Sequence, residues 1–99
     1  MTNPTLRVVA RFVALPEKVE ALKAVLLELV EPTRHEAGCI KYELLQNQSD
    51  PTDLTFVEEW TSHDALNTHL VSAHMKAVGA KLEGLVVAEP DVRQYNLLS

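Results

Sequence analysis

Residues 40–60, IKYELLQNQSDPTDLTFVEEW, contain two alternating stretches on either side of a turn. One face is formed by Ile40, Tyr42 and Leu44 in the first stretch and by Leu54, Phe56, Glu58 and Trp60 in the second. A period of two is typical of β-strands, and Asp50-Pro51 is a favourable opening for a turn. The segment therefore predicts two antiparallel strands joined by a short loop.

A strand pattern and a helix pattern precede this pair. Residues 6–14 alternate with a period of two, and apolar residues then recur at three- and four-residue steps from Pro16 to Val30. Pro32 should stop or kink that helix, and Gly38 suits a left-handed cap before the next strand.

The same two patterns follow the pair in the opposite order. Ser62 should cap a helix running from Asp64 to about Leu82, in which Ser72 and Gly79 suggest a bend or two shorter helices. Residues 92–97 form the last alternating stretch. The resulting order β-α-β-β-α-β predicts an α+β, ferredoxin-like fold, with a four-stranded antiparallel sheet and its helices on one face.

The size and charge of the chain restrict the functions it can have. Ninety-nine residues suffice for one hydrophobic core, so we expect a single domain over residues 1–99. A net charge of -5 opposes nucleic-acid binding. The only cysteine, Cys39, cannot form an internal disulfide, which favours the cytoplasm. Arginines interrupt the apolar N-terminal stretch, so we expect neither a signal peptide nor a membrane span.

The face of the sheet opposite the helices should be partly apolar. On the first strand it would present Val9 and Val13 between Arg7 and Arg11. An apolar strip of this kind is usually an association surface, and a two-fold pairing of sheets would cover it. We therefore expect a homodimer.

Glu58 is the most unusual residue of the pattern because it shares a face with Phe56 and Trp60, which should pack against the helices. A buried carboxylate must be paired, hydrogen-bonded or protonated. One interpretation is a structural ion pair or a cap on a backbone amide. The other is a general acid or base on the wall of a pocket between sheet and helices.

Two histidines lie on the core side of the second helix. In a continuous helix His69 and His74 would be about 140° apart, which does not suit two ligands of one metal, so we expect no metal site. Each histidine is either a hydrogen-bonded core residue or a base that, with Trp60, Tyr42 and Glu58, surrounds an aromatic ligand.

Two further segments favour structural roles. Cys39 is interpreted as a small buried residue beside Gly38. The Arg34-His35-Glu36 segment is interpreted as a solvated helix end, the alternative being that Arg34 and Glu36 lock the loop to a neighbouring subunit.

The central segment resembles the antibiotic biosynthesis monooxygenase superfamily, especially its small quinol-monooxygenase-like branch. That branch has an R-x-E-x-G-C-x-x-Y segment followed by E-x-W and H-x-x-S-x-H. The matching residues here are Arg34, Glu36, Gly38, Cys39, Tyr42, Glu58, Trp60, His69, Ser72 and His74. The resemblance spans nearly the whole chain.

The resemblance implies a dimeric α/β-barrel with a pocket between sheet and helices in each subunit. It implies oxidation of a small quinol or phenol by molecular oxygen, without metal, flavin or haem. Trp60 and Tyr42 would hold the ring, His69 or His74 would be the base, and Glu58 would orient a histidine or the substrate.

Two positions near Trp60 differ from the relatives that oxidise anthrones. Those relatives have a tyrosine six residues after the tryptophan and an asparagine four residues before it, where this chain has Leu66 and Phe56. Leu66 and Phe56 are therefore included in the expected substrate-binding set, for a substrate other than a polyketide anthrone.

Two alternatives remain open. The first is an isomerase or lyase of a small oxygenated metabolite that uses the same histidine and glutamate for proton transfer. The second is a non-catalytic dimer that binds a small ligand and whose histidines are structural.

Overall fold

A computed structural model describes residues 5–99. Residues 1–4 lie outside the described residues. They begin the N-terminal stretch that we do not expect to be a signal peptide. The elements are β1 (Leu6–Val13), a 3-10 turn η1 (Pro16–Lys18), α1 (Val19–Leu27), α2 (Val30–Arg34), β2 (Cys39–Gln46), β3 (Asp53–Trp60), α3 (His63–Leu70), α4 (Ala73–Gly79) and β4 (Asp91–Asn96).

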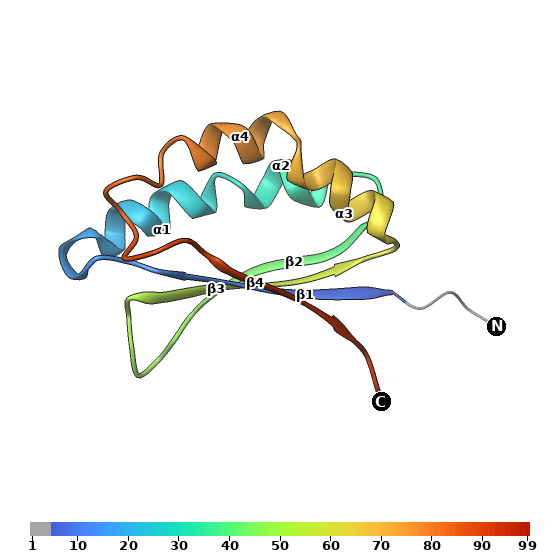
Figure 1. Cartoon of the computed structure of the whole chain (residues 1–99), viewed down its shortest axis with the longest axis horizontal. Coiled ribbons are helices and arrows are strands. Elements are labelled where there is room, and N and C mark those ends of the chain that lie inside the picture. The colour runs from blue at the N-terminus through green and yellow to red at the C-terminus, as the bar shows by residue number, and fades with distance from the viewer. Residues whose placement is uncertain (1–4) are drawn as a thin grey trace.

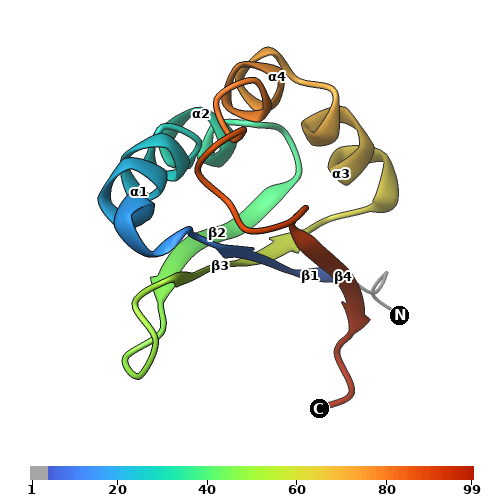
Figure 2. The same ribbon diagram turned by 60° about the vertical axis from the view of Figure 1, so that its left-hand side comes forward.

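The four strands form one antiparallel sheet in the order β2-β3-β1-β4. All the helices lie on the same side of this sheet, and the other side is open (Figures 1 and 2). The predicted α+β, ferredoxin-like topology is confirmed.

The central strand β3 follows the predicted alternation. Leu54, Phe56, Glu58 and Trp60 are all buried on the helix side. The prediction for β2 is wrong at Ile40, which is half exposed. Cys39 pairs with Trp60 and Lys41 pairs with Glu59, so Ile40 is the extra residue of a β-bulge and leaves the inward face.

The first helical stretch is broken rather than continuous. It consists of η1, α1 and α2, and Pro32 lies inside α2 rather than beyond the end of a helix. Proline has no N–H for the carbonyl four residues earlier, which belongs to Glu28, and the break falls at Glu28 and Leu29. The predicted kink is therefore real, but it precedes the proline.

The second helical stretch is also two helices. Ser62 caps α3 by accepting a hydrogen bond from the N–H of Ala65, and Ser72 caps α4 in the same way through Met75. Helix α4 ends at Gly79, three residues before the predicted end. Leu70 is half exposed because it lies at the corner where α3 ends.

One hydrophobic cluster fills the space between sheet and helices, with the helix-side residues of β1 and β3 packed against Leu22, Leu26 and Leu29. The open face carries Val9, paired with Val57, between the ion pairs Arg7–Glu59 and Arg11–Asp53.

Strand β4 is bonded to β1 but is exposed at every residue. It is an edge strand, and within residues 5–99 its outer side has no neighbouring strand, although Val92 pairs with Ala10 on the helix side of the sheet.

Among residues 5–99, no helix is long and apolar enough to cross a membrane.

Candidate functional site

A small cavity of about 50 Å³ lies between the sheet and the helices. Tyr42, Phe56 and Glu58 of the sheet line one side, and His69 of α3 lines another. Leu70, Met75 and Val92 complete the wall. This volume holds a few water molecules and is smaller than a typical ligand pocket of about 300–1,000 Å³. The cavity would have to widen to admit an aromatic ring.

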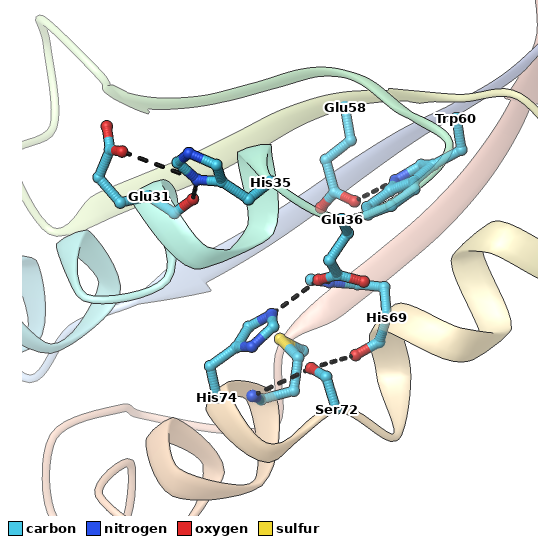
Figure 3. A network of polar contacts seen from close by, with 9 residues as sticks. Glu31, His35, Glu36, Glu58, Trp60, His69, Ser72 and His74 are labelled. Atoms are coloured by element: carbon cyan, nitrogen blue, oxygen red, sulfur yellow. Dashed lines mark hydrogen bonds and ion pairs between the residues drawn. The ribbon is translucent and has the colours of Figure 1, made fainter.

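Glu36, from the turn between α2 and β2, joins the two histidines. Its Oε2 lies 2.7 Å from Nδ1 of His69 and 2.7 Å from Nε2 of His74 (Figure 3). The Glu36 side chain is 13% exposed and that of His69 only 2%. Within residues 5–99, the ion-pair partners of Glu36 are these two imidazoles.

This arrangement assigns the proton positions on His69. A carboxylate oxygen can only accept, so Nδ1 of His69 donates to Glu36 and Nε2 keeps its lone pair. Burial lowers the pKa of His69, against the opposing hydrogen bond to Glu36, which favours the neutral ring. His69 is therefore a neutral imidazole on the cavity wall, with its lone pair on Nε2.

Gly38 brings Glu36 close to α3. Its φ is +87°, and a Cβ atom at this position would lie 2.5 Å from Cβ of Ala65 and 2.7 Å from Oγ1 of Thr61. Only glycine fits such a backbone conformation at such a close approach. The predicted left-handed conformation of Gly38 is confirmed, but Gly38 does not cap the helix, because α2 ends at Arg34 with His35 as its cap. Gly38 instead lies in the turn, where it places Glu36 against the helix that carries His69.

The corner between α3 and α4 brings the two histidines together. Ser72 donates through Oγ to the carbonyl of His69 and caps α4, so the chain turns between the two rings. The predicted angle of about 140° between His69 and His74 assumed one continuous helix. That assumption is wrong, because the chain turns between α3 and α4. The ring centroids lie 6.0 Å apart.

Glu58 is held by the neighbouring side chain on its own strand. Nε1 of Trp60 donates to Glu58 Oε1 at 2.9 Å, and the glutamate is 4% exposed. Burial raises the pKa of Glu58 to about 7, although the Trp60 hydrogen bond opposes the rise and the charge of Glu36 adds to it. Among residues 5–99, Glu58 forms neither an ion pair nor a backbone cap, and it lies on the cavity wall.

Aromatic rings enclose His69. The Trp60 ring centroid lies 4.7 Å from that of His69, and the Tyr42 ring meets His69 edge-on at 5.5 Å. Tyr42 also stacks on Phe56 at 4.7 Å. Burial, reinforced by the charge of Glu58, raises the pKa of Tyr42 well above its usual range, so its hydroxyl stays protonated.

The residues expected at the site take different places. Glu58, His69, Tyr42 and Phe56 meet at the cavity, whereas Trp60 and Leu66 are buried but do not line it. His74 does not line the cavity, and it is joined to His69 on the cavity wall by their shared contact with Glu36.

The sequence interpretation missed Glu36. The segment Arg34-His35-Glu36 was expected to be a solvated helix end, which is true of the exposed His35 but wrong for Glu36. Arg34 donates to the backbone carbonyl of Tyr42. The available signal was the position of Glu36 two residues before Gly38, whose conformation turns the chain back towards α3.

Glu36, His69 and His74 also form a group that could hold a metal ion. Their ligand atoms all lie within 4.8 Å of one another. Two nitrogens and one carboxylate oxygen are ligands that suit divalent transition metals.

Comparison with known proteins identifies the family of this chain. The family model for antibiotic biosynthesis monooxygenases matches residues 5–81. Rv0793 of Mycobacterium tuberculosis is 39% identical over 74 residues, which are 75% of this chain and 71% of that protein. YcnE of Bacillus subtilis is 30% identical over 82 residues, 83% of this chain and 86% of that protein. Both relatives are named as provisional monooxygenases.

Solved structures agree over almost the full length. PA3566 from Pseudomonas aeruginosa superposes with a TM-score of 0.93 at 30% identity, covering 100% of this chain and 99% of that one. The structure of Rv0793 gives a TM-score of 0.89 and covers 96% of each chain. With matching segments, topology and length, this chain belongs to the antibiotic biosynthesis monooxygenase family.

Proposed function

We propose that this protein is a monooxygenase that oxidises a small quinol or phenol with molecular oxygen and needs no cofactor. The supporting observation is the Glu36–His69 pair, in which Glu36 orients an imidazole that lines an aromatic-lined cavity. An electron-rich phenol becomes a good electron donor once its hydroxyl proton is removed. A positioned neutral histidine is the group suited to that step near neutral pH.

For a quinol the reaction balances as quinol plus O2 giving a hydroxyquinone plus water. His69 takes the hydroxyl proton, and the resulting anion transfers one electron to oxygen. The radical pair then joins, so that a C–O bond forms at the ring. The O–O bond breaks, one oxygen atom stays on the ring and the other leaves as water. The second electron pair needed for water comes from the ring as it becomes a quinone.

Glu58 is suited to supply or hold the proton that the leaving oxygen requires. Its pKa of about 7 keeps both protonation states populated near neutral pH. Tyr42 and Phe56, which line the cavity, would contact the substrate ring, while the Trp60 ring packs against His69.

Substrate entry would widen the cavity on the side of Leu70, Met75 and Val92. Leu70 is 46% exposed and Val92 is 52% exposed, so these side chains can rotate outwards without disturbing the core. Closure over the ring would then exclude water from the radical pair.

Oxygen uptake tests the proposal. The protein is incubated under air with a panel of reduced quinones and phenols, and compared with His69→Gln and with His63→Gln, which changes an exposed histidine of the same helix. Uptake above the uncatalysed rate, lost in His69→Gln and kept in His63→Gln, supports the proposal. No uptake above the uncatalysed rate with any compound would contradict it.

The alternative of an isomerase or lyase has one observation in its favour. Glu58 and His69 line the same cavity and are poised as a proton donor and a proton acceptor. Conversion of a substrate that continues without oxygen would favour this alternative over the monooxygenase.

We also propose that the protein is a cytoplasmic homodimer in which two sheets pack through their open faces. Val9 and Val57 lie in the middle of that face, and Tyr95 of the edge strand β4 is 47% exposed. A second copy would cover both features at once. The free thiol of Cys39 suits a reducing compartment.

A further inference from the structure

We propose that Glu36, His69 and His74 bind one divalent transition-metal ion of the Zn²⁺ type. The three residues come from three different elements, the turn before β2, helix α3 and helix α4. The tertiary structure therefore assembles the group, and nothing in the local sequence requires it. Figure 3 shows the Glu36 carboxylate lying between the two imidazole rings.

The charge of the group leaves room for a cation. Glu36 is a mostly buried carboxylate, and no lysine or arginine in the described part of the chain forms an ion pair with it. One nitrogen of each imidazole lies 2.7 Å from the carboxylate oxygen. A divalent ion would offset the charge of the carboxylate, and an imidazole that binds it through one ring nitrogen keeps its proton on the other.

The distances require only a small adjustment. In a tetrahedral zinc site with bonds of about 2.0–2.1 Å, the ligand atoms stand about 3.3 Å apart. Oε2 of Glu36 now lies 2.7 Å from each nitrogen, and all three atoms lie within 4.8 Å. Glu36 sits in a turn, so its carboxylate can move outwards by roughly half an ångström to admit the ion.

Glu36 borders a depression in the protein surface. A surface depression of about 400 Å³ is lined by Glu36, Thr61, Asp64 and Thr68. Asp64 places a second carboxylate at this depression, which attracts cations. Three protein ligands with water in the fourth position is a common arrangement for zinc.

The donor set selects the ion. Imidazole nitrogens favour Zn²⁺, Co²⁺, Ni²⁺ and Cu²⁺, whereas Mg²⁺ and Ca²⁺ prefer oxygen ligands throughout.

Occupation of the site by a metal ion would also affect the reaction, an inference that rests on the proposed function. With the ion on Nδ1, the proton of His69 lies on Nε2, so the nitrogen available to the cavity becomes a donor. Metal binding would therefore inhibit the oxidation.

Co²⁺ is the probe for binding, because its visible absorption reports its coordination. The metal-free protein is titrated with Co²⁺, followed by competition with Zn²⁺. We expect one bound ion per chain, with binding weakened at least about tenfold in Glu36→Gln and in His74→Gln. His35→Gln is the matched control, since His35 lies beside Glu31 on the exposed surface with the same residue types. Cys39→Ser controls for the thiol.

Unchanged affinity in His35→Gln and Cys39→Ser, with loss in the two ligand variants, supports the site. No binding to the wild-type protein, or equal binding by Glu36→Gln, overturns it. If a ligand variant fails to fold, imidazole ¹⁵N spectra of the wild-type protein with Zn²⁺ decide. Shifts confined to the rings of His69 and His74, with Nε2 of His69 becoming protonated, support the site, and shifts confined to the other histidines overturn it.

The binding measurement does not depend on activity. A metal site without oxygen uptake would contradict only the proposed function, and oxygen uptake without a metal site would contradict only this inference.

Discussion

Oε2 of Glu36 lies 2.7 Å from Nδ1 of His69, although the two residues are 33 positions apart in the chain. This contact determines which nitrogen of His69 carries the proton, and so makes the other nitrogen a base. It is the same division of roles by which a carboxylate orients the histidine of a hydrolase triad.

Glu36→Gln should lower kcat about tenfold to a hundredfold and change KM little, because the amide holds the ring less firmly and does not stabilise its charged form. Steady-state oxygen uptake over a range of pH measures this. Glu36→Asp should recover part of the rate. Equal kcat in wild type and Glu36→Gln would show that Glu36 does not position the base.

Glu58→Gln should remove a pH dependence of stability. The pKa of Glu58 rises from 4.5 to about 7 on folding, so the folded state binds more protons, and stability falls as pH rises through this window. Between pH 4.5 and pH 8, the unfolding free energy of the wild type should fall by on the order of 3 kcal/mol. Glu58→Gln should not show this fall. Urea unfolding at several pH values measures it, with the exposed Glu43→Gln as control.

Trp60→Phe should move the pH range over which stability falls to higher pH. The indole N–H stabilises the charged form of Glu58, and phenylalanine cannot donate this hydrogen bond. The midpoint of the stability loss should therefore move to higher pH in Trp60→Phe. A midpoint that stays in place or falls would mean that the hydrogen bond has no effect on Glu58.

Gly38→Ala should be much more damaging than Gly84→Ala. Both glycines have positive φ, but a Cβ at Gly38 would collide with Ala65, whereas a Cβ at Gly84 would meet nothing within 4 Å. We expect Gly38→Ala to cost about 2–4 kcal/mol of unfolding free energy and Gly84→Ala about 1 kcal/mol, measured by urea unfolding. Equal costs would show that the close approach to α3 is not needed.

The dimer is tested by light scattering after size exclusion. The chain mass is 11.0 kDa, so the wild type should give about 22 kDa at micromolar concentration. Val57→Lys on the open face should give the monomer mass, while Leu27→Lys, at an exposed position of α1, should not change the mass. A wild-type mass of about 11 kDa would rule out the dimer.

The sequence by itself determined the order of the elements and the inward face of β3. Alternation of period two reports directly which side chains share a face of a strand, so the burial of Glu58 beside Trp60 follows from local pattern. Ser62 marked a helix start for an equally local reason, since a capping side chain bonds its own helix, and Ser72 suggested a bend or a break between two helices.

Only the tertiary structure decided how the site is assembled. Periodicity places a residue on a helix face but carries no information on where the helix axis turns, so the corner at Ser72 brought His74 back beside His69. The bulge at Ile40 and the close approach at Gly38 depend likewise on neighbouring elements. Glu36 became a central residue because contacts across 33 and 38 positions depend on packing, which no local pattern encodes.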